Sequence, residues 1–374
     1  MDLNISALLI TLQHTNASYK YLFFYALIRI IKKNQEIEEI TFKEIIKEML
    51  LLAWLPSFQF NLKFRKSDQI QELLKQYTIG IDIGLKEKRP TNKILDEINK
   101  TLDKVVNDND KFIYLEKELL RYVIARLVRP FYKRLENMPE SGEKGMYKTS
   151  PKILVDDYNK ENPFYLINEQ KKKISLNKEW KKYFIQHFIF LELWILDGFW
   201  NYMKLYNQGI PSLYEKIKFP NIKRNSLAPI RKFWEKIIKN NPNKIKCIFS
   251  NNTLNLDNFE IDHFIPWSYL GHDEGWNLVP ILNKVNLIKK NQLPSKSHIE
   301  SFIKFKVNSI KFAEETLLKK DSQSYLLTHL NFLSLETNSI NEIFIKKYRE
   351  KIENLRINAK NNGFKDFKFQ INQN

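Results

Sequence analysis

The segment that most constrains this chain is residues 260–294, where two short apolar runs enclose a polar loop. The first run is rich in β-prone residues and contains Asp262 and His263, and the second precedes a stretch with helical spacing. This pattern predicts a strand, a loop, a second strand and a helix in close succession. We therefore expect a small α+β insertion in the chain.

The polar residues of this segment have the chemistry that hydrolysis of a phosphodiester requires. His263 can act as the general base, and the carboxylate of Asp262 is a candidate ligand for a hard cation. On the predicted helix, Asn286 and Lys289 are three residues apart and share a face, so they could offer an amide oxygen to a metal and an ammonium to a phosphate. Neighbouring strand residues point to opposite faces, so Asp262 and His263 reach one phosphate only if the strand twists or bulges.

Taken together, Asp262-His263, then Asn277, then Asn286 followed by Lys289 resemble the motif of the HNH (ββα-metal) endonucleases, in the variant whose third signature residue is asparagine. Asn277 and Asn286 follow His263 by 14 and 23 positions, which is similar to the HNH domain of RNA-guided effector nucleases and of many bacterial restriction-type proteins. The resemblance covers residues 245–295 only.

The resemblance implies a role for each of these residues. His263 would be the base, Asp262 and Asn286 the metal ligands, Asn277 the brace that orients His263, and Lys289 the phosphate contact. Oxygen ligands without a thiolate favour Mg²⁺ or Mn²⁺. The implied activity is metal-dependent endonucleolytic hydrolysis with DNA as the first choice of substrate, and family analogy suggests bacterial anti-phage defence or restriction.

A structural zinc site is the feature of many HNH proteins that this sequence departs from. Residues 246–250 look like a zinc knuckle in which the second cysteine is replaced by Ser250, and Cys247 is the only cysteine in the chain. No structural Cys₄ zinc is therefore expected within one protomer. Hydrophobic packing must hold this region instead, with Cys247 as a small buried residue.

The charge balance favours a polyanionic partner. The formal net charge is +18 and the isoelectric point about 9.5, as expected for a chain that binds nucleic acid by neutralising phosphates. Residues 119–135 have apolar residues at helical spacing together with four arginines, which could track a phosphate backbone; they are Arg121, Arg126, Arg129 and Arg134. His272 and Lys290 are further candidate contacts. A solvated helix face or loop remains the alternative for all of them.

The remaining sequence predicts a mainly α-helical protein around the insertion. Residues 1–135 are expected to be helical, 136–152 to be a linker or exposed loop, and 153–240 to be helical with a hairpin. The nuclease core would occupy 241–297, and C-terminal helices 298–374. The helical regions have no motif of their own and could hold a protein partner or a second copy.

Local signals give several element boundaries. Thr41 with Glu44 predicts a capping box ahead of a helix that Pro56 should stop, and Asn177 should begin a long helix to about residue 206. Residues 164–167 and 174–176 predict the hairpin, and Asn283 is expected near the N-cap of the helix in the nuclease core.

No targeting segment and no membrane association are expected. The apolar stretch 188–200 is too short to span a bilayer and includes Glu192 and Asp197, so it predicts a buried helix, and the cytoplasm is the expected compartment. Two other functional classes stay open, namely a nucleic-acid-binding module whose HNH frame is inactive, and a scaffold for a defence complex. Metal-dependent cleavage would separate both from a nuclease.

Overall fold

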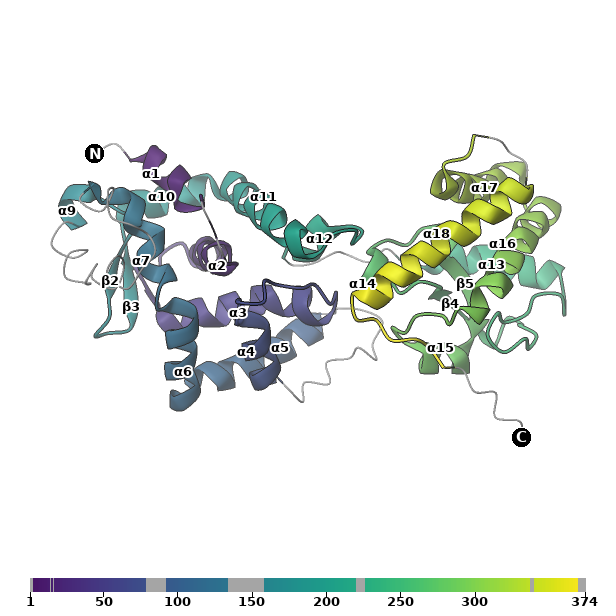
Figure 1. The fold of residues 1–374 in the computed structure, drawn as a ribbon, viewed down its shortest axis with the longest axis horizontal. Coiled ribbons are helices and arrows are strands. Elements are labelled where there is room, and N and C mark those ends of the chain that lie inside the picture. The colour runs from purple at the N-terminus through teal and green to yellow at the C-terminus, as the bar shows by residue number, and fades with distance from the viewer. Residues whose placement is uncertain are drawn as a thin grey trace. The chain divides into compact units, whose positions relative to one another are not determined.

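The computed structural model describes residues 3–13, 15, 17–78, 92–133, 158–219, 226–336 and 340–368. The chain divides into two compact units (Figure 1). The first comprises Met1–Ile83, Pro90–Gln208 and Lys216–Asn221, and the second comprises Gly84–Arg89, Gly209–Glu215 and Ile222–Asn374. The described residues are mainly helical with two small antiparallel sheets, which confirms the predicted fold class.

The first unit is built around the helices α2 (Tyr19–Lys33) and α3 (Phe42–Phe58), whose apolar residues are almost all buried. The predicted capping box is confirmed, because Thr41 accepts a bond from the Glu44 amide while Glu44 accepts one from the Thr41 amide. The prediction that Pro56 stops α3 is wrong. Pro56 lies in the last turn, where a missing N–H removes only one helical bond, so the helix continues to Phe58.

The sheet of the first unit has the strand order β1-β3-β2. The predicted hairpin is confirmed as β2 (Tyr165–Asn168) and β3 (Lys173–Leu176), whereas β1 (Glu39–Thr41) was not predicted because three residues show no periodicity. Asn177 caps α10, but the expected long helix is interrupted at His187. The other helices here are α1 (Ile5–Thr11), α4 (Ile70–Thr78), α5 (Asn92–Asn107), α6 (Asn109–Leu115), α9 (Tyr158–Glu161), α10 (Lys178–Gln186) and α11 (Phe188–Tyr206). The short helix α12 (Leu213–Ile217) begins in the second unit and ends in the first.

The arginine-bearing segment is not the single helix that its spacing predicts. It consists of a π-helical turn η1 (Glu116–Leu120), the short helix α7 (Val123–Val128) and a 3₁₀ turn η2 (Arg129–Phe131). The wider π turn rotates the residues that follow, and Pro130 lacks the N–H that would continue an α-helix. Arg134 and residues 136–152 lie outside the described residues.

The second unit confirms the predicted strand, loop, strand and helix, as β4 (Phe259–His263), β5 (Leu278–Leu282) and α15 (Asn283–Lys289). The N-cap of α15 is Leu282, so Asn283 is the first residue of the helix and lies next to the N-cap, as predicted. The loop holds α14 (Trp267–Leu270) and the 3₁₀ turn η4 (Gly275–Asn277).

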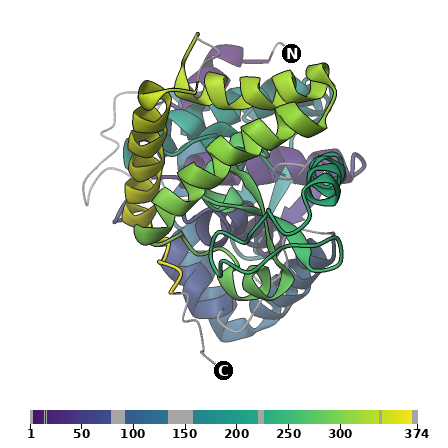
Figure 2. The same cartoon turned by 90° about the vertical axis from the view of Figure 1, so that its right-hand side faces the viewer.

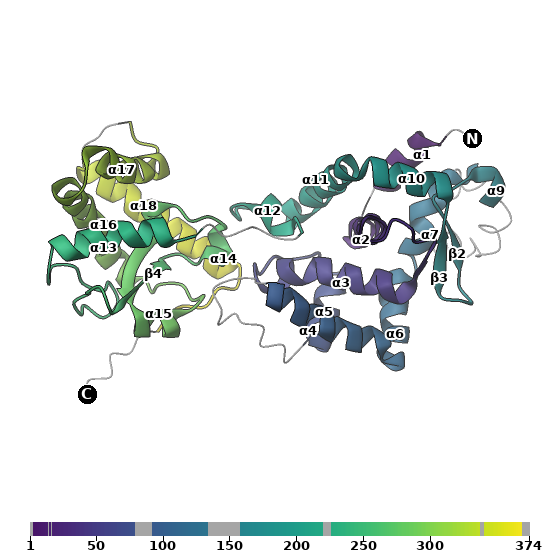
Figure 3. The same ribbon diagram turned by 180° about the vertical axis from the view of Figure 1, so that it is seen from behind.

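Four longer helices accompany this core. Figure 2 shows α16 (Ser297–Thr316), α17 (Lys319–Leu333) and α18 (Glu342–Asn361) in light green to yellow, and Figure 3 shows α13 (Ala228–Asn240) beside β4. The rings of Phe264 and Phe302 stack with centroids 3.8 Å apart, which joins the segment after β4 to α16. None of the helices that the structure describes is both long and apolar enough to cross a bilayer.

Candidate catalytic site of the ββα core

The two strands of the core are paired in continuous antiparallel register. His263 lies opposite Leu278 and Asp262 opposite Val279, and the five paired positions run without a bulge. The bulge that would bring both side chains to one side is therefore absent from this pairing. His263 is the last residue of β4, directly before the segment that Asn277 holds.

His263 has a carboxylate partner that the sequence did not reveal. Its Nε2 lies 2.8 Å from Oδ1 of Asp273, and the two side chains are only 8% and 9% exposed. In a neutral imidazole that donates Nε2–H to Asp273, the lone pair is on Nδ1. The pair therefore fixes the ring and selects the nitrogen that can accept a proton. The only sequence signal was a carboxylate in the glycine-flanked loop.

Asn277 connects the second strand to the backbone just after His263. Its Oδ1 accepts a bond from the amide of Ile265, its Nδ2 donates to the Ile265 carbonyl, and both distances are 2.8 Å. The backbone carbonyl of Asn277 also accepts a bond from the Phe264 amide at 2.9 Å. Asn277 is completely buried, so it acts on the loop and not on solvent.

Lys289 occupies a different environment from the phosphate contact that the motif suggested. Its side chain is completely buried, and Nζ donates a 2.8 Å bond to the carbonyl of His263. Nζ also lies 2.9 Å from Oδ2 of Asp262, at ion-pair distance but without the angles of a hydrogen bond. The ammonium thus links two consecutive residues of β4, which favours a structural role over contact with a substrate phosphate.

Four residues of this core have a buried side-chain oxygen without a hydrogen-bond partner, namely Asp262, Ser268, Asn283 and Asn286, and two of these oxygens belong to the residues predicted to bind a metal. They are Oδ2 of Asp262 and Oδ1 of Asn286, whose residues are 7% and 4% exposed. Carboxylate and amide oxygens are ligands that Mg²⁺ and Mn²⁺ prefer, and Oδ2 of Asp262 is also the oxygen that lies at ion-pair distance from Lys289. No three His, Cys, Asp or Glu side chains gather as a metal cluster in the described part of the chain.

The other predicted nucleic-acid contacts are His272 and Lys290 in the second unit and the arginines of the first unit. His272 is half-buried with its ring 5.7 Å from that of Trp276, and Lys290 is exposed just after α15 with φ of +48°. The arginines belong to the first unit, where Arg121 is exposed, Arg126 is half-buried and Arg129 is only 8% exposed. The burial of Arg129 does not favour a role in a continuous phosphate-binding stripe.

The turn η4 is held by side chains from the C-terminal helices that sequence reasoning missed. Nζ of Lys306 donates to the carbonyls of Gly275 and Leu278 at 2.9 and 2.6 Å, and the hydroxyl of Tyr348 donates to the carbonyl of Trp276 at 2.9 Å. Complete burial lowers the pKa of Lys306 well below its ordinary value. Nζ also donates to the hydroxyl of Tyr325 at 3.4 Å, so it has three acceptors in this buried position.

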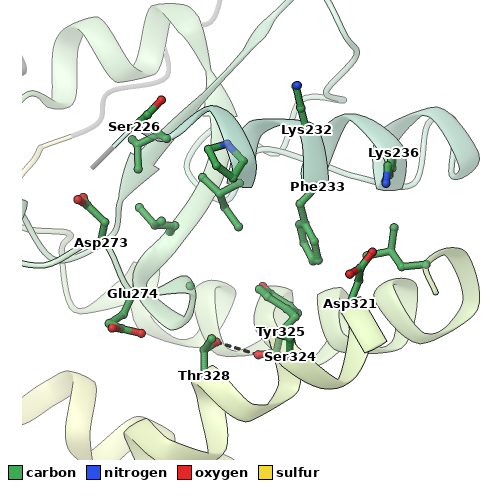
Figure 4. A pocket seen from close by; sticks show the side chains of 16 residues that line it. Ser226, Lys232, Phe233, Lys236, Asp273, Glu274, Asp321, Ser324, Tyr325 and Thr328 are labelled. Carbon is green, nitrogen blue, oxygen red and sulfur yellow. Dashed lines mark hydrogen bonds between the residues drawn. The ribbon is translucent and has the colours of Figure 1, made fainter. Parts of the chain in front are cut away.

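A cavity of about 510 Å³ adjoins the loop that carries Asp273 (Figure 4). Asp273 and Glu274 border it from the loop, Lys232 and Phe233 from α13, and Tyr325 from α17. With Lys236 and Asp321 also in its wall, the cavity has three carboxylates and two ammonium groups. This mixed charge does not favour a phosphate-rich ligand.

The zinc-knuckle-like segment forms a tight turn without a second cysteine. The amide of Cys247 donates to the carbonyl of Asn252 and the amide of Asn251 donates to the carbonyl of Cys247, both at 2.8 Å. Cys247 is 1% exposed and Phe249 packs against Phe264 with ring centroids 6.3 Å apart. Backbone bonds and packing thus shape this turn.

Comparisons with known proteins agree with the location of this core. A family model described as HNH endonuclease matches residues 247–295. Comparisons with curated protein sequences and with solved structures gave no match.

Proposed function

Because residues 247–295 belong to the HNH endonuclease superfamily, we propose that this chain is a metal-dependent nuclease that hydrolyses phosphodiester bonds, with DNA as its substrate. The observation that carries the proposal is the His263–Asp273 pair in the same small core as the buried side-chain oxygens of Asp262 and Asn286. A general base and a pair of hard oxygen ligands are the two parts that this hydrolysis needs.

We propose that His263 activates the attacking water. Nδ1 would take a proton as the water oxygen bonds to phosphorus and the bond to the leaving sugar oxygen breaks. The imidazolium that forms would be stabilised by Asp273 across the 2.8 Å contact at Nε2. Asp273 is therefore a positioning residue that holds the ring in the productive tautomer.

The other motif residues have supporting roles in this proposal. Asp262 and Asn286 would hold Mg²⁺ or Mn²⁺, which when bound stabilises negative charge on the phosphate and the leaving oxygen. Asn277 would fix the backbone after His263, and Lys289 would fix β4 through the His263 carbonyl and the Asp262 carboxylate. Lys289 is thus reassigned from phosphate contact to positioning residue.

A cleavage assay tests the proposal directly. Plasmid, single-stranded DNA and RNA are incubated with the protein in Mg²⁺, in Mn²⁺ and in EDTA. We expect cleavage of DNA that needs the metal and that falls by about 10²- to 10⁴-fold in His263→Ala, because a positioned general base contributes that much. The matched control is His187→Ala, a substitution in the first unit between α10 and α11.

Three results would contradict the assignment. Cleavage that persists in EDTA would show that the reaction does not need a metal. Full activity in His263→Ala would show that His263 is not the general base. Binding of DNA without cleavage in either metal would favour the alternative of a nucleic-acid-binding module with an inactive HNH frame. A role in anti-phage defence or restriction remains a prediction that a phage plating assay with His263→Ala would test.

A further inference from the structure

A second cleft of about 550 Å³ lies between the turn that contains Cys247 and the helix α16. Lys244 and Lys246 border it from the turn, and Lys304 from the helix, and all three side chains are exposed. Among the described residues no aspartate or glutamate lines it. The cleft therefore has three positive charges and no negative one, in contrast to the cavity beside Asp273.

The floor of this cleft is aromatic. Phe305 and Phe312 line it from α16 and are half-buried, so each ring keeps part of its surface open. Ser301 and Asn308 line it from the same helix, at spacings that place all four on one face. Exposed cations around open aromatic rings are the combination by which proteins bind unpaired nucleotides.

The cleft borders the proposed catalytic core. Phe249 forms part of its wall, and the same ring lies 6.0 Å from Nζ of Lys289, which pairs with Asp262. His298 also lines the cleft, with its ring 4.9 Å from that of Phe249. Burial and the nearby Lys289 lower the pKa of His298, so the positive charge of the cleft comes from the lysines.

We propose that this cleft binds a single-stranded segment of nucleic acid next to the cleavage site. Phosphates would lie against Lys244, Lys246 and Lys304, and bases would stack on Phe305 and Phe312. The choice of ligand rests on the proposed function. Duplex DNA fits less well, because its base faces are covered by their neighbours. An acidic peptide would satisfy the lysines but would bring no flat ring to the phenylalanines.

The charge half of the proposal is tested by binding without cleavage. Binding of a fluorescent oligothymidylate to the His263→Ala protein is followed by anisotropy over a range of salt concentrations in EDTA. The variant Lys244→Ala/Lys246→Ala/Lys304→Ala should reduce the slope of log affinity against log salt by about 0.7 per lost contact. The matched control, Lys311→Ala/Lys320→Ala/Lys346→Ala, removes the same charge from exposed lysines outside the cleft and should leave the slope nearly unchanged.

The stacking half is tested in the same assay. Phe305→Leu and Phe312→Leu keep an apolar side chain but remove the ring, and each should weaken binding by about 5- to 150-fold without changing the salt slope. Phe233→Leu on α13, outside this cleft, is the control. Phe305 also packs on Trp234 with ring centroids 5.4 Å apart, so Phe312→Leu carries the test if the melting temperature of Phe305→Leu falls.

Each possible outcome either supports the proposed binding site or overturns it. Equal losses in the cleft and control lysine variants would show general electrostatic attraction and overturn the site. Loss with the lysines but not with either phenylalanine, together with displacement by poly-glutamate, would assign the cleft to an acidic protein. Tighter binding of a duplex of the same length would overturn the single-stranded ligand. The binding assay needs neither metal nor cleavage. A chain that binds as proposed but never cleaves DNA would therefore refute the proposed nuclease activity and leave the proposed binding site in the cleft standing.

Discussion

Removal of the Asn277 side chain should loosen the loop after His263 by an amount that the structure allows to be estimated. The amide of Asn277 is the partner of both the N–H and the carbonyl of Ile265, which is completely buried. Asn277→Ala leaves two buried backbone groups without a partner, and each costs about 1–3 kcal/mol. We therefore expect the loop to lose about 2–6 kcal/mol, which is a large fraction of the stability of an ordinary domain.

Hydrogen exchange followed by mass spectrometry measures this local loss. The amide of Ile265 should exchange about 30- to 10⁴-fold faster in Asn277→Ala, because opening then costs about 2–6 kcal/mol less. Asn277→Asp should keep the hydrogen bond from the Ile265 amide. The second carboxylate oxygen would then face the Ile265 carbonyl, which would lose its donor. Asn240→Ala, on an exposed helix end, is the control for loss of an asparagine. Exchange at the wild-type rate at residues 264–266 in Asn277→Ala would refute the role of Asn277 as the brace of this loop.

Three further predictions concern the neighbours of this loop. Asp273→Asn should lower cleavage while DNA binding is retained, because the amide no longer selects the Nδ1 lone pair of His263; a pH–rate profile identical to wild type would contradict this. Lys289→Met should lower stability in calorimetry by about 3–5 kcal/mol by leaving Asp262 as an unpaired buried charge, whereas a phosphate contact would lower affinity alone. The pKa of Lys306 is lower in the folded protein than in the unfolded chain, so the unfolded chain binds more protons. The free energy of unfolding should therefore rise with pH up to about 10.5, the ordinary pKa of lysine, with a slope of at most about 1.4 kcal/mol per pH unit. Lys306→Met should lose this rise, and equal pH dependence of the melting temperatures of the two proteins would be evidence against a neutral amine.

Elements whose signals are local were predictable from the sequence. The helix Tyr19–Lys33 and the Thr41–Glu44 capping box follow from periodicity and from the capping chemistry of neighbouring residues. The order of strand, loop, strand and helix around Asp262 and His263 also follows from local sequence patterns. Turns of the chain that break periodicity were not predictable. The π turn before Arg121 changes the face of the arginines by an insertion that composition does not reveal.

The partners of the site residues were the less predictable part. Asp273 is ten positions from His263, in a loop whose course no periodicity sets. Lys289 is a basic residue in a charged sequence, and nothing in its neighbours along the chain indicates complete burial. Burial and long-range pairing depend on how helices pack, so a motif gives the residues of a site before it gives their roles.

The C-terminal helices belong to the functional core, although the family match ends at residue 295. The carbonyls of Gly275 and Leu278 take their donors from α16, and that of Trp276 takes its donor from α18. These three residues enclose Asn277, which in turn holds Ile265 two positions after His263. A fragment limited to residues 247–295 would lose every one of these side-chain donors. The geometry around His263 is therefore a property of the whole second unit, and the helices that follow the motif are part of what a working site requires.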